Sequence, residues 1–146
     1  LGLAIPGFPN LFTITGPGSP SVLSNMPVSI EQHVDWITEC IAHCIETGCT
    51  SIEAQEQSAE IWTDHVRETA DATLLPKVQH SWYLGANIPG KPRVFMPYAG
   101  GLNIYRKICN NVAEEGYKGF NLNSGKELGP AKPLDFISSE GLSLGV

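Results

Sequence analysis

The chain of 146 residues is 42% hydrophobic and 16% charged, with a formal net charge of −6; this is a globular composition that excludes a disordered chain. Without a basic run there is nothing to hold a phosphate backbone, so nucleic acid is not an expected partner. No apolar run approaches the roughly 20 residues of a membrane-spanning helix, so no membrane is expected either.

The start of the chain is unusual for a complete protein. Leu1 to Asn10 have neither the basic region nor the apolar region of a signal peptide. The chain also begins without methionine, inside an apolar segment that contains Gly and Pro. These features predict a piece of a longer protein.

The four cysteines, which include Cys49 and Cys109, are spaced like neither a metal site nor a secreted disulfide framework. Cys40 and Cys44 lie one helical turn apart, where small hydrophobic residues are expected. A zinc site that includes His43 is disfavoured, because His43 points to another side of the same helix. We therefore expect reduced structural cysteines in a cytoplasmic protein.

The first predicted element is a buried strand over residues 11–15, a β-branched and aromatic run that a rigid turn over residues 16–20 follows. Pro27 is expected to keep the residue before it out of a helix. The first helix should begin at Ser29, in a capping box with Gln32, and end at Gly48. Its apolar residues recur at helical spacing and predict one buried stripe. They are Ile30, Val34, Ile37, Ile41 and Ile45.

A second helix should begin at Thr50, with Glu53 as its box partner, and stop before Pro76. One side of this helix is expected to be buried, and His65 on that side is expected to be a core histidine rather than a ligand. The other members of that side are Ile61, Trp62, Val66, Thr69 and Ala70.

Residues 80–101 are rich in aromatic residues, glycine and proline, and predict a long ordered loop with a functional role. A short edge strand is expected at Val94 to Tyr98. A third helix over residues 102–115 should stop at Gly116, and a loose tail should follow Phe120. The inward side of the third helix is expected to consist of Leu102, Tyr105, Ile108 and Val112.

One strand does not form a sheet without neighbours, so this set of elements also indicates a piece of a larger fold. Gly16 and Gly18 after the predicted strand are similar to the start of a dinucleotide-binding fingerprint, but Ser21 stands where its third glycine is needed. Pro17 and Pro20 also remove backbone donors. The sequence therefore excludes a phosphate-binding role for this turn.

The same strand, turn and capped helix could instead direct a helix N-terminus toward a ligand's partial negative charge, such as the pyrimidine edge of a reduced flavin. An ordinary strand–loop–helix connection is the alternative. The residues alone leave both open.

Two stretches resemble type I Baeyer–Villiger monooxygenases, which are class B flavoprotein monooxygenases. GFPNLFTITGPGSPSVLSNMPVSIEQHVDWI (residues 7–37) is similar to the last flavin-domain strand and following helix of that family. SWYLGANIPGKPRVFMPYAGGLNIYRKICNNVAEEGYKGF (residues 81–120) is similar to its C-terminal region with the mobile control loop. The similarity is strongest to the phenylacetone and steroid monooxygenase branch.

The resemblance implies a C-terminal piece of an α/β enzyme with two Rossmann-like nucleotide-binding domains; the piece itself is expected to be mostly α, with one buried strand and a long ordered loop. Residues 1–28 would be the terminal strand and the substrate and flavin loop of the FAD-binding domain. Residues 29–79 would be helical and pack on that domain. Residues 80–120 would form the control loop and C-terminal helix, and residues 121–146 a flexible tail.

Site roles follow from the resemblance. Residues Ser21, Val22 and Leu23 would line the ketone pocket. The backbone of Asn25 and Met26 would meet the flavin pyrimidine edge, and Met26 would also face the substrate. Trp82 would contact the nicotinamide cofactor. Each role has a structural alternative: for example, Trp82 could simply cover the core and Met26 could fill a gap.

Several family features are absent from the sequence. They are the two nucleotide fingerprints, the Phe–Gly–His–Trp linker signature and the catalytic arginine, which Arg67, Arg93 and Arg106 do not match. No catalytic residue is therefore expected in this chain, and the chain alone is expected to be inactive. Its partners would be the missing N-terminal FAD and NADP domains of the same enzyme.

The implied parent enzyme binds FAD and NADPH and uses O2 to convert ketones to esters or lactones through a C4a-peroxyflavin. One alternative is a related class B monooxygenase of the N-hydroxylating or flavin-containing type. The other is a small helical binding module that grips a partner with its aromatic loop.

Overall fold

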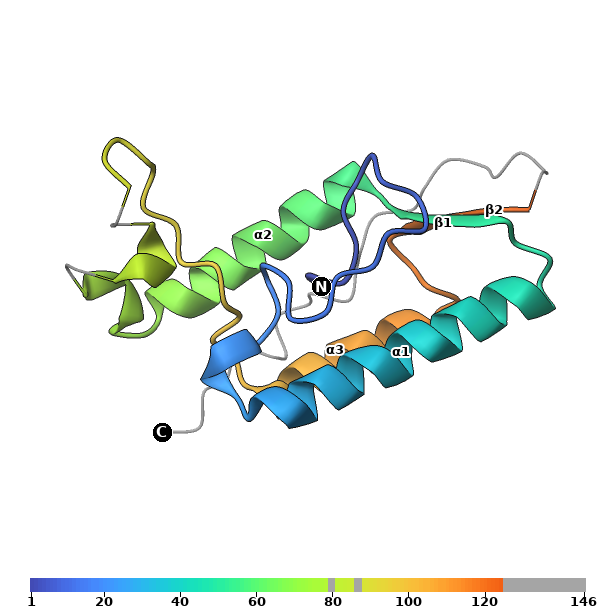
Figure 1. The fold of residues 1–146 in the computed structure, drawn as a ribbon, viewed down its shortest axis with the longest axis horizontal. Helices are drawn as coiled ribbons and strands as arrows, with labels where there is room; N and C mark the ends of the chain where they lie inside the picture. The colour runs from blue at the N-terminus through green and yellow to red at the C-terminus, as the bar shows by residue number, and fades with distance from the viewer. Residues whose placement is uncertain (79–80, 86–87, 125–146) are drawn as a thin grey trace.

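The computed structural model describes residues 1–78, 81–85 and 88–124, with the side chain of Val22 excepted. Figure 1 shows the elements in this part of the chain: helices α1 (Met26–Glu46), α2 (Glu56–Asp71) and α3 (Leu102–Glu114), and strands β1 (Ser51–Ala54) and β2 (Phe120–Asn123). Short 3-10 turns lie at Ser21–Leu23, Leu75–Lys77 and Trp82–Leu84. The predicted mostly helical chain with a long loop is confirmed.

Helix α1 begins at Met26, so the predicted start at Ser29 is wrong. Asn25 caps the helix, and its side chain accepts a hydrogen bond from the backbone N–H of Val28 at 3.4 Å. Pro27 occupies the first turn, where a missing N–H leaves no hydrogen bond unmade. Ser29 is buried and its hydroxyl is hydrogen-bonded to that of Ser24.

The end of α1 is confirmed, because Gly48 adopts a φ of 70° directly after the helix. Gly48 donates its N–H to Ile45 at 3.2 Å, and Cys49 donates its N–H to Cys44 at 2.7 Å. These two bonds form a Schellman motif that satisfies the last carbonyl groups of the helix.

The predicted buried stripe of α1 is wrong. The side that α1 buries consists of Ser29, Gln32, His33, Trp36 and Cys40. Four of the predicted residues, Ile30, Val34, Ile41 and Ile45, are exposed, and the exposure of Ile45 reaches 74%. The buried side packs on α3, and of the predicted stripe only Ile37 is half-buried against the core.

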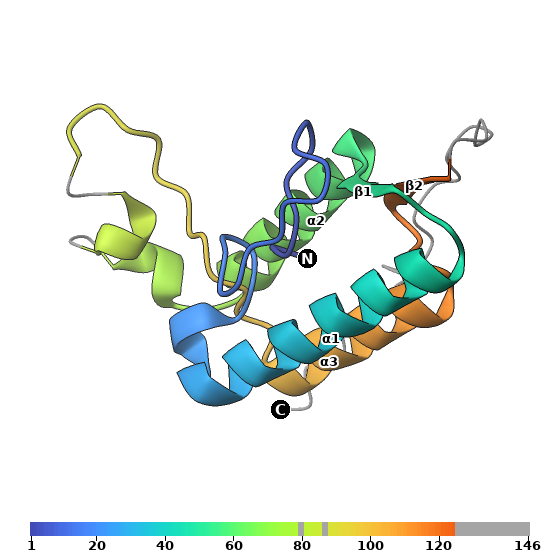
Figure 2. The ribbon, with the colours of Figure 1, turned by 45° about the vertical axis from the view of Figure 1, so that its right-hand side comes forward.

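Helices α1 and α3 lie side by side and run in the same direction (Figure 2). The rings of His33 and Tyr105 lie 5.6 Å apart, and further along the pair Trp36 donates its indole N–H to the carbonyl oxygen of Cys109 at 2.9 Å. The partner numbers rise together along both helices, as parallel packing requires.

The predicted strand over residues 11–15 does not form. Phe12 makes a single antiparallel bridge with Ala4, and Leu11 and Ile14 are exposed. Thr15 adopts a φ of 54°, which is incompatible with a strand. A β-branched run without a neighbouring strand has no ladder to join.

The one sheet of the described residues pairs β1 with β2 antiparallel, with Ile52 opposite Leu122. The predicted helix start at Thr50 is therefore wrong, and α2 begins only at Glu56. The predicted buried side of α2 is confirmed at Trp62, Val66 and Ala70. A loose tail directly after Phe120 is also wrong; residues 125–146 lie outside the described part.

Helix α3 agrees with the prediction: it buries Tyr105 and Val112 and stops before Gly116, whose φ is 72°. The predicted strand at Val94 to Tyr98 is wrong, because those residues form irregular loop. None of the described helices combines the length and the apolar character needed to cross a membrane.

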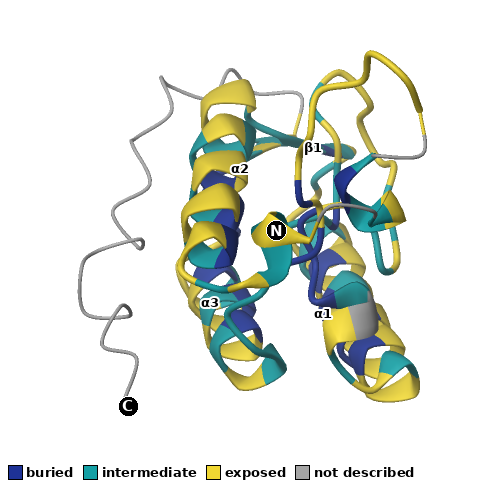
Figure 3. Cartoon of the chain, turned by 90° about the vertical axis from the view of Figure 1, so that its left-hand side faces the viewer, coloured by how far each residue is buried: buried dark blue, intermediate teal, exposed yellow. Residues whose placement is uncertain are grey.

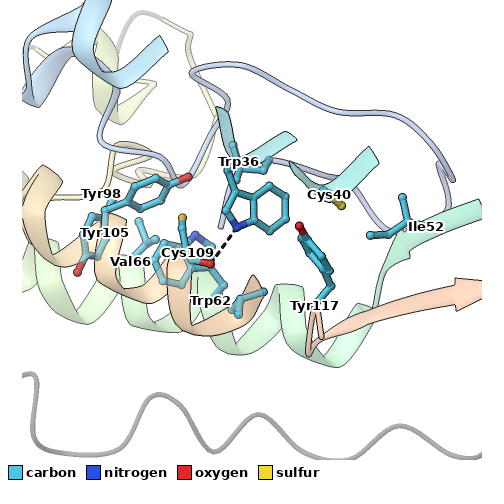
Figure 4. Close-up of a cluster of buried hydrophobic side chains, with 11 residues drawn as sticks. Trp36, Cys40, Ile52, Trp62, Val66, Tyr98, Tyr105, Cys109 and Tyr117 are labelled. Carbon is cyan, nitrogen blue, oxygen red and sulfur yellow. Dashed lines mark hydrogen bonds between the residues drawn. The ribbon is translucent and has the colours of Figure 1, made fainter. Parts of the chain in front are cut away.

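The core lies where α1, α2 and α3 meet (Figures 3 and 4), and it is rich in aromatic residues. Figure 4 shows the bond from Trp36 to the Cys109 carbonyl inside it. The cysteines are free, and Cys40 and Cys109 belong to this core. A smaller cluster of Ala70, Leu84 and Phe95 fixes the loop against the end of α2.

Candidate functional site

A groove of about 270 Å³ lies between two segments that are distant in the sequence. One wall is formed by Thr15, Gly16, Pro17 and Ser21. The opposite wall is formed by Trp82, Tyr83, Met96 and Pro97. We call this cavity the Ser21–Trp82 groove. It brings together two residues to which the family resemblance gives a ligand role.

Backbone hydrogen bonds join the two walls. The N–H of Gly18 donates to the carbonyl oxygen of Met96 at 2.9 Å, and the N–H of Tyr98 donates to that of Ser19 at 2.8 Å. Trp62 on α2 donates its indole N–H to the carbonyl oxygen of Gly18 at 3.0 Å. The groove is therefore fixed to the core on both sides.

Trp82 presents an open aromatic surface: it is 66% exposed, and its ring stacks on Tyr83 with centroids 3.9 Å apart. A second cavity of about 370 Å³ adjoins the groove and shares Trp82, Tyr83 and Met96 with it. Within the described residues, Trp82 therefore covers little of the core.

Two residues of the first wall have unusual backbone conformations. Thr15 has a φ of 54° and Ser21 a φ of 44°, in a region that residues other than glycine rarely adopt. Such residues cost on the order of 1–3 kcal/mol each and persist only where their surroundings hold them. They are concentrated at functional sites, which supports a role for this wall.

The remaining predicted site residues lie beside the groove, not in its lining. Asn25 and the half-buried Met26 form the N-terminal end of α1, a few residues after the turn that carries Ser21. Leu23 is exposed on that turn, and the side chain of Val22 lies outside the described part. The structure thus brings Ser21 and Trp82 into one cavity and leaves Leu23, Asn25 and Met26 at its side.

Sequence reasoning missed Thr15, Tyr83 and Met96 as lining residues. The signal for Tyr83 and Met96 was present in the aromatic loop, which was predicted to be functional. Nothing local indicates Thr15, because its role depends on which distant segment its turn faces.

The lining of the two cavities carries almost no ionisable groups. Of the described residues that form it, only Lys91 carries a formal charge, and none is Asp, Glu, His or Cys. Most of the lining is apolar or aromatic, so this surface is suited to bind and orient an apolar or aromatic ligand.

Two histidines lie behind the groove. Burial lowers the pKa of His33 and of His65 below the ordinary 6.5, so both rings are neutral at neutral pH. The ring of His65 packs 5.6 Å from that of Tyr98, and its Nε2 has no hydrogen-bond partner in the described residues. His65 is half-buried at the edge of the core, where its ring contacts those of Trp62 and Tyr98.

No family model matches the chain. Among curated relatives, acetone monooxygenase (methyl acetate-forming) of Gordonia sp. (strain TY-5) is 44% identical over 123 residues, and a Baeyer–Villiger monooxygenase of Pseudooceanicola batsensis is 44% identical over 117 residues. Phenazine N-monooxygenase of Lysobacter antibioticus is 43% identical over 124 residues. These matches cover 84%, 80% and 85% of the chain, but only 23%, 21% and 22% of the relatives.

The solved structures that resemble this chain also include monooxygenases. Steroid monooxygenase bound to NADP is 48% identical with a TM-score of 0.77, over 85% of this chain and 22% of that one. OTEMO in complex with FAD and NADP is 31% identical with a TM-score of 0.76, over 84% of this chain and 22% of that one. The chain thus spans about a fifth of the length of the proteins that it matches.

Proposed function

Because the chain belongs to the Baeyer–Villiger monooxygenase family, we propose that it forms one side of the site where an α/β flavoprotein oxidises a ketone with FAD, NADPH and O2. The observation that carries the proposal is the Ser21–Trp82 groove, which joins the segment that resembles the ketone pocket to the segment that resembles the control loop. The product would be an ester or a lactone. The rest of the site would come from the remaining domains of the parent enzyme.

The N-terminal end of α1 fits the flavin. The helix begins at Met26, so its positive end coincides with Asn25 and Met26, the two positions to which the resemblance gives the flavin contact. Backbone N–H groups at such an end favour the partial negative charge of a reduced flavin's pyrimidine edge, by about 1 kcal/mol in a partly dry site. Asn25 is exposed and open to such a ligand.

Trp82 fits the nicotinamide cofactor. Its ring is already stacked on Tyr83 and keeps one face open, so a second aromatic ring could stack on it without prior rearrangement. Among the described residues that line the adjoining cavity, Lys91 carries the one positive charge. FAD supplies the redox and oxygen chemistry when bound, and this chain's residues orient ligands and exclude water.

The exposed apolar side of α1 supports the expectation that residues 29–79 pack on the FAD-binding domain. A row of apolar side chains on one helix, without cover in the described residues, is typical of a surface that packs on another domain. We assign it to the FAD-binding domain of the same polypeptide. The free cysteines agree with a cytoplasmic location.

N-oxygenation is the second candidate function. It is favoured by the phenazine N-monooxygenase relative, whose identity of 43% nearly equals that of the ketone-oxidising relatives. Among the described residues, the lining of the Ser21–Trp82 groove carries no formal charge and suits an apolar ketone or an aromatic amine alike. Ketone oxidation and N-oxygenation differ in the substrate that receives the oxygen atom, so the identity of the product distinguishes the two candidate functions.

The experiment is a product analysis with the full-length flavoprotein that contains this chain. Purified FAD-loaded enzyme is incubated with NADPH and ¹⁸O2, separately with an aryl ketone such as phenylacetone and with phenazine. The proposal predicts one ¹⁸O atom in an ester and NADPH consumption that matches product. Oxygen only in phenazine N-oxide would favour the second candidate, and hydrogen peroxide alone would contradict both.

A further inference from the structure

His33 is a buried residue of α1 that touches the wall of the groove. It is 0% exposed, and its Nδ1 accepts a hydrogen bond from the backbone N–H of Thr15 at 3.0 Å. Its Nε2 has no partner in the described residues. Tyr105 on α3 packs edge-on against the ring, with centroids 5.6 Å apart. The bond to Thr15 is thus the one polar contact that the ring makes there.

Thr15 needs such a partner. It is β-branched and held at a φ of 54°, where a threonine is a genuine outlier. Its neighbour Thr13 is fixed separately, through its N–H to the carbonyl oxygen of Leu3 at 2.9 Å and through its hydroxyl to that of Gly2. The bond from Thr15 to His33 is therefore what joins the strained residue to α1.

The direction of this bond fixes the state of the ring. Nδ1 accepts only when it carries no proton, so the ring must be neutral with its proton on Nε2. Burial lowers the pKa of His33 and so favours that neutral form. A leucine would fill a similar volume but offers no acceptor, whereas the side-chain oxygen of an asparagine can replace Nδ1.

We infer that His33 is a positioning residue for the proposed oxygenation: it holds the Thr15–Pro17 wall in its strained conformation opposite Trp82. The inference rests on the proposed function, since the wall matters only if the groove holds a ligand. His33 lies behind the wall and does not line the groove. It acts through the backbone of Thr15. Loss of the His33 side chain should therefore make the wall of the groove more variable in position and leave the chemical step intact.

The first test compares His33→Leu with His33→Asn in the full-length, FAD-loaded enzyme. Loss of one buried hydrogen bond corresponds to about a tenfold change in binding. We expect His33→Leu to raise KM for the ketone about tenfold with kcat within about threefold, which is the pattern of lost uniform binding. His33→Asn should return KM to within about threefold. Equal KM values in the two variants, or a fall in kcat alone, would overturn the inference.

A second-site variant separates positioning from simple filling of the core. Glycine adopts a positive φ without strain, so Thr15→Gly should hold the wall in place even without the histidine. We expect Thr15→Gly, when combined with His33→Leu, to bring the raised KM most of the way back to that of the unaltered enzyme. A leucine that merely packs badly against Tyr105 would not be rescued by a change in the backbone preference of residue 15, and absence of rescue would count against the inference.

Nitrogen-15 NMR of the unaltered enzyme keeps the test open if His33→Leu fails to fold. A spectrum with the proton of His33 on Nε2, and a Thr15 amide protected from exchange, would support the inference. The proton on Nδ1, or a rapidly exchanging Thr15 amide, would overturn it. An enzyme that oxidises no ketone would refute the proposed function, whereas these spectra would still decide the contact between His33 and Thr15.

Discussion

The indole N–H of Trp62 donates to the carbonyl oxygen of Gly18 at 3.0 Å, so a core side chain of α2 holds the turn that leads into the groove. Gly18 has a φ of 86° and bonds through its own N–H to Met96 on the opposite wall. One residue therefore links α2, the first wall and the aromatic loop. The geometry of the groove depends on this junction.

Replacing Gly18 with alanine should damage both stability and the groove. A Cβ at this position would lie 2.9 Å from Nε1 of Trp62, and its φ of 86° also disfavours any side chain. We expect a loss of about 2–3 kcal/mol in the free energy of unfolding, from the clash and the backbone strain together. Denaturant titration of the full-length enzyme measures it.

Gly48→Ala is the matched control, because Gly48 also has a positive φ, of 70°, but nothing lies within 4 Å of its added Cβ. It should cost only about 1 kcal/mol, from the backbone alone. Equal losses in the two variants would show that the contact with Trp62 does not matter.

Removal of the Trp82 ring should affect the cofactor and not the fold. The side chain is 66% exposed, so Trp82→Ala is expected to change the free energy of unfolding by less than about 0.5 kcal/mol. Loss of a stacking surface should raise KM for NADPH by about tenfold. Trp82→Phe, which keeps an aromatic face, should retain most of the affinity. Steady-state kinetics with varied NADPH would contradict the role if Trp82→Ala behaved like the unaltered enzyme.

The exposed apolar side of α1 should matter only when the other domains are present. Ile41 lies in the middle of this side, whereas Ala42 is exposed on another side of the same helix. A buried carboxylate is costly without a partner, so Ile41→Asp should lower the FAD content and yield of the full-length enzyme several-fold. Ala42→Asp should leave both unchanged. The ratio of flavin absorbance to protein absorbance measures the difference. Equal FAD content in the Ile41→Asp and Ala42→Asp variants would contradict the assigned interface.

Stability should fall below about pH 6.5 because of two histidines. Burial lowers the pKa of His33 and His65 in the folded protein below the ordinary 6.5, so the unfolded chain binds protons first as the pH falls. Their contribution to stability is complete above pH 6.5 and is lost toward the lower folded pKa values, by up to ~1.4 kcal/mol per pH unit for each proton. NMR titration reads each ring separately. Titration of either ring at or above pH 6.5 would contradict the expected loss.

Features governed by local chemistry could be predicted from the sequence. Gly48 and Gly116 mark the ends of their helices, because a left-handed residue is required there. The buried side of α2 follows from helical periodicity at Trp62 and Val66. The family resemblance is carried by two continuous stretches of sequence, so it can also be recognised without the fold. The identities of 44% and 48% to monooxygenases confirm the resemblance.

Features governed by distant partners could not be predicted. The start of α1 does not follow from Pro27, because a proline disfavours helix at the residue before it but is also favourable in the first turn of a helix. The isoleucine side of α1 has the right period for burial, but most of it stays exposed within the described residues. Segment 51–54 became a strand only because residues 120–123 lie beside it.

The candidate site was predicted in part. Ser21 and Trp82 share the groove, but their proximity depends on the bonds from Gly18 to Met96 and from Tyr98 to Ser19, which no local pattern indicates. The polar buried side of α1, and His33 in particular, was missed for the same reason.

Hydrogen exchange of the full-length, FAD-loaded enzyme with and without NADP⁺ tests the central claim most directly. If the Ser21–Trp82 groove is one ligand site, amides of residues 15–21 and of residues 82–85 should slow together when NADP⁺ binds, because both walls enclose it. Amides of the distant sheet, residues 51–54, serve as the internal control and should not change. Protection of only one wall, or of neither, would contradict the account.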